Sequence, residues 1–150
     1  RKIVVFGPPA VGKSTLMGLV ARAASRGLLP KVNVVDLESV EDPLPLFKLV
    51  VYDKPYIRVV MGGGALSPGD AEGAVHLYIL PAIRNYRRTY FRKAKKRGVG
   101  ARTPSHTWEG AVKTWVTFNK WFGKDEGAYI VSNVSAALQF IVSYYKGGAP

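Results

Sequence analysis

The sequence has no cysteine, only two histidines and no long apolar run, and each absence excludes a class of protein or site. Without cysteine there are no disulfides and no thiolate metal sites, which favours a cytoplasmic protein. His76 and His106 lie far apart in the sequence, so they predict no metal site. No apolar run approaches the roughly 20 residues that span a bilayer, and no secretory leader is recognisable. We therefore expect a cytoplasmic protein that has no membrane partner.

Acidic residues are scarce as well, with ten Asp and Glu against 22 Lys and Arg, which gives a formal net charge of +12. The excess is local, because the segment from Arg84 to Arg102, both included, has nine basic residues and no acid. Such a segment attracts the phosphates of a nucleotide, a sugar or a nucleic acid. A chain of 150 residues suffices for one domain with one core. We therefore expect a single domain, residues 1–150, with a phosphate-bearing partner.

Short apolar runs alternate with helical patterns along the chain. We expect strands at 2–6, 32–35, 56–61, 75–80 and 129–131. We expect helices at 12–26, at 81–97, from an N-terminal cap at Thr103-Pro104 through Phe122, and at 134–145. The segment from Glu38 to Pro55 is ambiguous, since Leu46–Val51 could be a short helix or a strand. Strands that alternate with helices predict a parallel sheet with helices on both faces.

The first strand leads into a phosphate-binding motif, Gly7-Pro8-Pro9-Ala10-Val11-Gly12-Lys13-Ser14, and a helix follows. The glycines let successive backbone N–H groups point at an anion, and the helix N-terminus adds partial positive charge. Lys13 would reach the β- and γ-phosphates, Ser14 would ligate Mg²⁺, and Thr15 would contact the α-phosphate. The motif therefore predicts binding of ATP with Mg²⁺.

Two further segments follow expected strands, where ligands of open parallel sheets bind. Asp36 could hold Mg²⁺ through water or act as a general base, and Glu38 could orient an acceptor. Gly62-Gly63-Gly64 would allow close approach of the backbone to substrate. The alternatives are that Asp36 caps the next segment, that Glu38 pairs with a surface lysine, and that the glycines form a flexible turn.

The phosphate-binding motif, Asp36-Leu37-Glu38 and Gly62-Gly63-Gly64-Ala65-Leu66-Ser67-Pro68 together resemble the shikimate kinase-like branch of the P-loop kinases. More broadly, they resemble the nucleoside and nucleotide kinases. In that family an Asp-x-Asp turn and a Gly-Gly-Gly segment bind the acceptor, and an Arg-bearing lid closes over ATP. The resemblance implies acceptor binding by Asp36, Glu38 and the three glycines, and a lid at 97–107. The second acid is Glu here, and no Phe-Arg pair follows it, so shikimate itself is not implied.

The helix expected at 81–97 has an apolar stripe of Ile83, Tyr86, Tyr90 and Ala94, and basic residues cover much of the remainder. Its Arg88 and Arg92 lie one turn apart and would surround the transferring phosphate if they face the motif. On the loop that follows, Arg102 is the candidate lid residue. The alternatives are a solvated basic face or a surface over residues 84–102 that binds nucleic acid.

Three rival functions are considered. A GTP switch is disfavoured, because Phe122 stands where Asn119-Lys120-x-Asp would need its acid. A nucleic-acid motor would need an acid at the end of an apolar strand to hold Mg²⁺, and Asp36 could serve. A P-loop domain that has lost its chemistry is disfavoured by the intact Lys13, Ser14 and Asp36.

The expected fold is α/β: a three-layer P-loop NTPase fold whose five-stranded parallel sheet, in the order 2-3-1-4-5, is flanked by helices. The expected function is transfer of the γ-phosphoryl group of ATP, with Mg²⁺, to a hydroxyl or phosphate of a small molecule. The alternative is a P-loop ATPase that acts with nucleic acid through its basic helix. Ser14 and Asp36 are the metal-ligand candidates. Catalytic candidates are Lys13, Asp36, Arg88, Arg92 and Arg102.

Overall fold

The computed structural model describes residues 3–29, 34–36, 49–52, 57–58, 64–65, 73–97 and 107–147. The helices in these ranges are α1 (Lys13–Ser25), α2 (Ile83–Arg97), α3 (Trp108–Lys124) and α4 (Val134–Gly147). The strands are β1 (Ile3–Phe6), β2 (Val34–Asp36), β3 (Leu49–Tyr52), β4 (Ile57–Arg58), β5 (Gly64–Ala65), β6 (Val75–Ile79) and β7 (Tyr129–Val131). Within the described residues, no helix has the length and hydropathy needed to cross a membrane.

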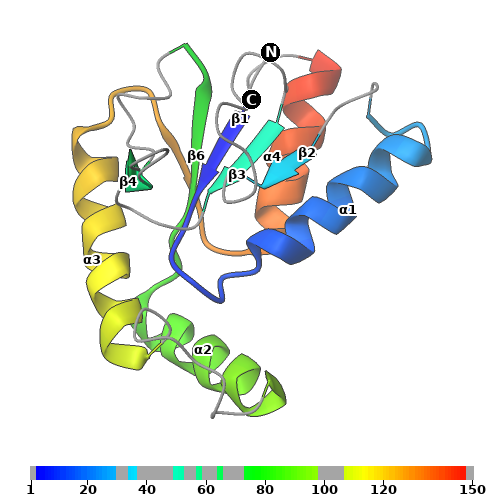
Figure 1. The fold of residues 1–150 in the computed structure, drawn as a ribbon. Coiled ribbons are helices and arrows are strands. Elements are labelled where there is room, and N and C mark those ends of the chain that lie inside the picture. The colour runs from blue at the N-terminus through cyan, green and yellow to red at the C-terminus, as the bar shows by residue number, and fades with distance from the viewer. Residues whose placement is uncertain are drawn as a thin grey trace.

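The larger sheet has the strand order β2-β3-β1-β6-β7, and each neighbouring pair is parallel (Figure 1). In its register, Phe6 at the end of β1 is level with Tyr52 of β3 and Tyr78 of β6. The carboxyl ends of all five strands therefore lie at one edge. Ligands of open parallel sheets bind at this edge.

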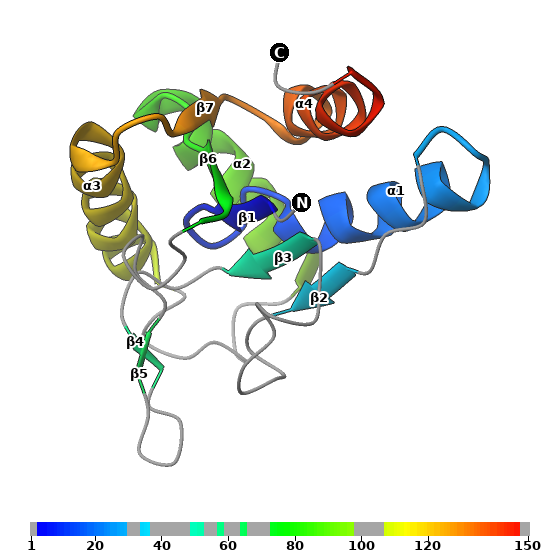
Figure 2. The same cartoon turned by 90° about the horizontal axis from the view of Figure 1, so that it is seen from above.

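The central strand β1 is buried on both faces, which explains why its sequence is a continuous apolar run. Its alternate side chains enter two different clusters. Ile3 and Val5 join the core that α1 and α4 cover, whereas Val4 and Phe6 pack in a second core with Phe118 of α3. Figure 2 shows the same arrangement, with α1 and α4 on one side of the sheet and α3 on the other.

The predicted fold is wrong in two respects. The segment predicted as the third strand does not join the main sheet, and the described residues form two sheets instead of one. Ile57–Arg58, inside the predicted strand 56–61, pairs antiparallel with Gly64–Ala65 in a separate two-stranded sheet. The place beside β1 belongs to Leu49–Tyr52, in the segment that the sequence left ambiguous. Both segments are short apolar runs, so periodicity alone cannot choose between them. Side-chain burial is described for only three strands of the larger sheet, β1, β6 and β7.

The start of α3 also differs from the expectation. Its N-cap is Thr107, whose hydroxyl accepts a hydrogen bond from the backbone N–H of Gly110 at 3.2 Å. The expected cap, Thr103-Pro104, lies outside the described residues. Glu109 in the first turn complements the positive end of the helix dipole. Two threonines with similar capping potential lie close together here, and local sequence cannot rank them.

Candidate functional site

The loop between β1 and α1 has the backbone of an anion-binding turn. Ala10 has a φ of 68° and Gly12 a φ of 106°, so both adopt left-handed conformations. A left-handed residue next to a right-handed one turns successive N–H groups toward one side of a loop. Ala10 is the one non-glycine residue of the described chain with a positive φ. Strain of this kind, about 1 kcal/mol, is commonly stored at binding sites.

The N-terminus of α1 is open toward the same side. Gly12 is the N-cap, no side chain caps the helix, and its first turn contains no acid. The first intrahelical bond runs from the N–H of Leu16 to the carbonyl of Gly12 at 2.8 Å. The N–H groups of the three preceding helical residues consequently have no intrahelical acceptor. Ser14 and Thr15 lie exposed in this first turn, so the positive helix end is accessible to an anion.

Lys13 brings a full positive charge into the loop. Its side chain is 6% exposed, and no other charged side chain in the described residues is buried. The ammonium donates hydrogen bonds to the carbonyls of Gly7 at 2.5 Å and Pro8 at 2.8 Å. These acceptors compensate for the loss of water that burial of a charge requires. The ammonium is therefore held across the loop, where it can reach a phosphate bound there.

Both glycines of the motif are required by the packing around the loop. A Cβ added to Gly7 would lie 2.9 Å from Cγ2 of Val11 and 3.1 Å from the carbonyl oxygen of Ile79 in β6. A Cβ added to Gly12 would collide with Cγ2 of Val134 in α4. The spacing of the motif is thus explained by close backbone approach to β6 and α4.

Helix α2 lies beyond the carboxyl edge of the sheet, across from the loop (Figure 1). The hydroxyl of the buried Tyr86 donates a hydrogen bond to the carbonyl of Pro9 at 2.6 Å. Burial, and secondarily the neighbouring Tyr90, raises the pKa of Tyr86 far above its ordinary value. The phenol therefore stays protonated and keeps this bond. The indole N–H of Trp115 in α3 donates to the carbonyl of Pro81, just before α2, at 2.9 Å.

Lys93 is a cation of α2 that lies beside the loop. Its Nζ would be 3.6 Å from a Cβ placed on Gly12. The sequence analysis did not single out Lys93, although a signal existed. Lys93 follows Tyr86 by seven residues, about two helical turns, so both lie on the same side of the helix.

The two arginines chosen from the sequence lie elsewhere on α2. Arg88 and Arg92 are both exposed. At about 100° per residue, Arg88 lies about 140° and Arg92 about 100° around the helix from Lys93. Their role around a transferring phosphate stays a prediction.

The remaining predicted residues are only partly described. Asp36 ends β2, which is separated from β1 by β3. Its backbone therefore lies two strands, about 10 Å, from the loop between β1 and α1 (residues 7–12, named the phosphate loop below after its sequence motif). Gly64 belongs to β5. Outside the described parts lie the side chain of Asp36, Glu38, Gly62, Gly63, Arg102 and residues 98–106 of the expected lid.

A second acid follows a strand that directly neighbours β1, and the sequence analysis missed it. Tyr52 is level with Phe6, and the next residue in the sequence after Tyr52 is Asp53. The signal is the apolar run Leu49–Tyr52 followed by an acid. The sequence left Leu46–Val51 open as a short helix or a strand, so the acid after it was not singled out. Asp53 itself lies outside the described residues.

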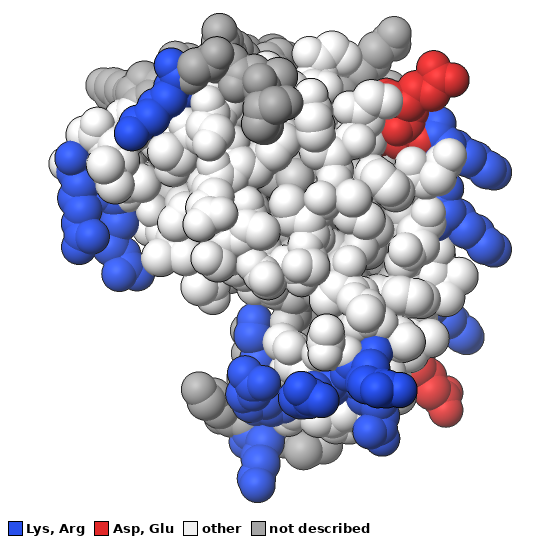
Figure 3. Space-filling view, turned by 180° about the vertical axis from the view of Figure 1, so that it is seen from behind, with Lys and Arg blue, Asp and Glu red and all other residues white. Residues whose placement is uncertain are grey.

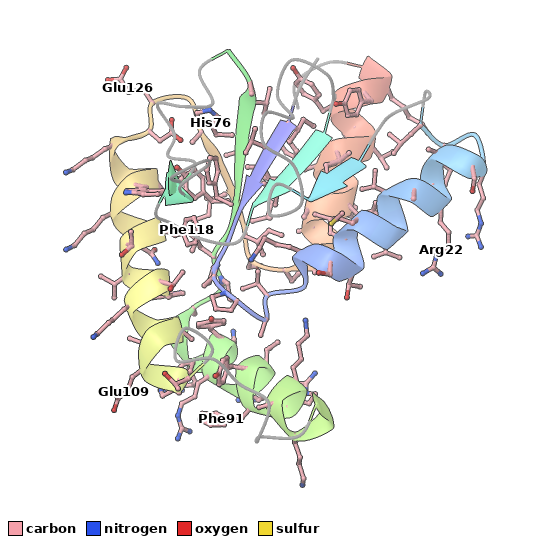
Figure 4. All side chains as sticks on the ribbon, viewed as in Figure 1. Arg22, His76, Phe91, Glu109, Phe118 and Glu126 are labelled. Atoms are coloured by element: carbon pink, nitrogen blue, oxygen red, sulfur yellow. The ribbon has the colours of Figure 1, made fainter. Side chains whose placement is uncertain are left out.

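A polar cluster lies at the opposite edge of the sheet, where β6 and β7 begin. Nδ1 of His76 is 2.7 Å from Oδ2 of Asp125, and the hydroxyl of Tyr78 donates to the same oxygen at 2.8 Å. A cavity of about 690 Å³ adjoins it, lined in part by His76, Trp121 and Glu126. Figure 4 shows His76 and Glu126 far from the phosphate loop. No group of three or more potential metal ligands occurs among the described residues.

The resemblance to the P-loop kinases is one of sequence motifs alone. No protein-family model matches the chain, and no curated protein matches it.

Proposed function

We propose that the chain binds ATP with Mg²⁺ at the loop between β1 and α1 and transfers the γ-phosphoryl group to a hydroxyl or phosphate of a small molecule. The observation that carries the proposal is the buried ammonium of Lys13, held by the carbonyls of Gly7 and Pro8 within the loop. The uncapped N-terminus of α1 supports it, because N–H groups and an ammonium that converge on one loop favour phosphates.

Each residue of the loop has a role in this proposal. Lys13 and the first N–H groups of α1 bind the phosphates, and the exposed hydroxyl of Ser14 is available to a metal ion. Mg²⁺, held in part by Ser14, would offset the negative charge of the phosphates. Lys93 stabilises the negative charge of the transferring group from the α2 side. Its nearness to Gly12 makes Lys93 the better candidate than Arg88 or Arg92.

Asp53 is the better candidate than Asp36 for the acid of this site. The strand that precedes Asp53 pairs directly with β1, whereas the strand of Asp36 is one position farther away. A carboxylate after the neighbouring strand is suited to contact Mg²⁺ through a water molecule. It is equally suited to remove the proton from the hydroxyl group that is phosphorylated.

The proposal is tested by ATP turnover with Mg²⁺ and separate acceptors: nucleosides, nucleoside monophosphates and small hydroxy acids. We expect ADP and one phosphorylated acceptor in equal amounts, identified by mass spectrometry. The substitution Lys13→Ala should lower turnover by at least about 100-fold, because the ammonium of Lys13 stabilises the negative charge that develops in the transition state.

The control is Lys113→Ala, which removes an exposed lysine of α3 and should keep the wild-type rate. Equal rates for Lys13→Ala and wild type would overturn the mechanism. Nucleotide binding without a phosphorylated product from any acceptor would overturn the transfer reaction and leave only a binding loop.

A further inference from the structure

The outward face of α2 carries a continuous basic stripe. Arg84, Arg88, Phe91 and Lys95 recur at intervals of four, three and four residues, which places them on one side of the helix. All four are exposed. The stripe is about 17 Å long at the rise of an α-helix. Figure 3 shows Lys and Arg gathered over α2 at the lower end of the molecule.

The site at the phosphate loop does not account for these charges. The opposite side of α2 packs against the molecule through the buried Tyr86, Tyr90 and Ala94. On that side, Tyr86 donates its hydrogen bond to the carbonyl of Pro9, and Lys93 lies near Gly12. The basic stripe therefore faces solvent, whereas the opposite side of α2 contacts the phosphate loop.

An exposed aromatic ring lies within the stripe. Phe91 is 44% exposed, and its ring centroid is 5.3 Å from that of Tyr90 and 5.6 Å from that of Trp108. The guanidinium carbon of Arg87 lies 5.1 Å from the Phe91 ring centroid. Figure 4 shows Phe91 on the outer side of α2, near the first turn of α3. Rings and guanidinium planes held in this way are surfaces on which nucleic-acid bases stack.

The positive charge of α2 and the exposed ring of Phe91 together indicate the class of partner. Helix α2 contains no acid in its sequence, so its outer face attracts a polyanion. A duplex keeps its bases stacked inside, whereas a single strand offers both phosphates and free bases. The combination of cations with an exposed ring therefore favours a single strand.

We propose that the outward face of α2 binds single-stranded nucleic acid, with Arg84, Arg88 and Lys95 on phosphates and Phe91 against a base. This binding is independent of the ligand of the phosphate loop. It adds a polymer partner to a chain whose proposed reaction concerns a small molecule.

The test is fluorescence anisotropy of a labelled oligothymidylate of about 16 nucleotides, titrated with the protein at several salt concentrations. The triple variant Arg84→Gln, Arg88→Gln, Lys95→Gln should bind more weakly. Its slope of log affinity against log salt should be smaller by about 2, since each single-strand phosphate contact contributes about 0.7. Phe91→Ala should weaken binding about tenfold with an unchanged slope.

The matched control is Lys113→Gln, Lys120→Gln, Lys124→Gln, which removes the same charge from exposed positions of α3 and should keep the slope. Equal losses in both triple variants would show that net charge, and not the stripe, binds the oligonucleotide. Equal affinity for a duplex of the same length would overturn the stacking role of Phe91. Lys13→Ala should bind the oligonucleotide like wild type, so that a failure of the kinase proposal and a failure of this one are distinguishable.

Discussion

Gly12 shows how a single position joins the phosphate-binding motif to the core. Its φ of 106° is one that side chains rarely adopt, and Val134 of α4 fills the space that a Cβ would need. The residue is therefore required twice, once by its backbone conformation and once by packing.

We expect Gly12→Ala to lower the free energy of unfolding by about 3 kcal/mol, from left-handed backbone strain and overpacking against Val134. Urea unfolding measures this, and nucleotide binding should be lost as well. Gly18→Ala is the matched control, because Gly18 is exposed in α1 and an added methyl group would project into open space. It should stabilise the protein by about 0.5–1 kcal/mol. A midpoint for Gly12→Ala at or above that of wild type would contradict the account of this glycine.

Among the elements, α2 has two faces with different tasks. Tyr86 and Lys93 turn toward the phosphate loop, and Tyr86 is anchored there by its bond to Pro9. Aromatic contacts from Tyr86 and Tyr90 to Trp108, with centroids 5.5 and 5.4 Å apart, join the helix to α3. The hydrogen bond of Tyr86 and these aromatic contacts thus help to hold the helix at the loop.

At this scale we expect Lys93→Ala to lower kcat about 100-fold, because one cation next to the transferring phosphate is lost. Arg92→Ala, the adjacent exposed position, should have a much smaller effect. Steady-state kinetics with saturating ATP measures both, and Lys113→Ala controls for the loss of one positive charge. A larger loss for Arg92→Ala than for Lys93→Ala would favour the sequence-based choice.

Over the whole molecule, two buried tyrosines link stability to alkaline pH. Burial raises the pKa of Tyr78 far above its ordinary value, and the hydrogen bond to Asp125 adds to the effect. Burial does the same to the pKa of Tyr86. Above about pH 10 the unfolded chain releases both phenolic protons while the folded chain keeps them. Their contribution to stability is therefore full below pH 10 and decreases as the pH rises.

We expect the free energy of unfolding to fall above about pH 10 by up to about 1.4 kcal/mol per pH unit for each tyrosine. Urea unfolding between about pH 8 and about pH 11 measures the slope. Tyr78→Phe and Tyr86→Phe should each remove one tyrosine's share, and the double variant both. Lysines also titrate in this range, so the prediction is tested by the difference in slope between the wild type and these variants. Slopes identical to wild type in both variants would refute it.

Local signals determined the parts of this chain that surround the phosphate loop. The apolar run Ile3–Phe6, the motif from Gly7 to Ser14 and the helical pattern after it lie within one stretch of sequence, and the structure confirms the strand and the helix. The strands β6 and β7 and the helix α4 were found in the same way. Each has a period or a boundary that depends only on its own residues.

Only the tertiary structure decided which segments meet. Leu49–Tyr52 and the predicted strand at 56–61 are both short, largely apolar segments, and pairing with β1 selects the first. Lys93 and Arg92 are adjacent and chemically alike, and the direction in which α2 packs puts Lys93 beside the loop. His76 and Asp125, 49 residues apart, become partners only when β6 and β7 align. These outcomes depend on contacts between distant segments, whose free energy no local pattern contains.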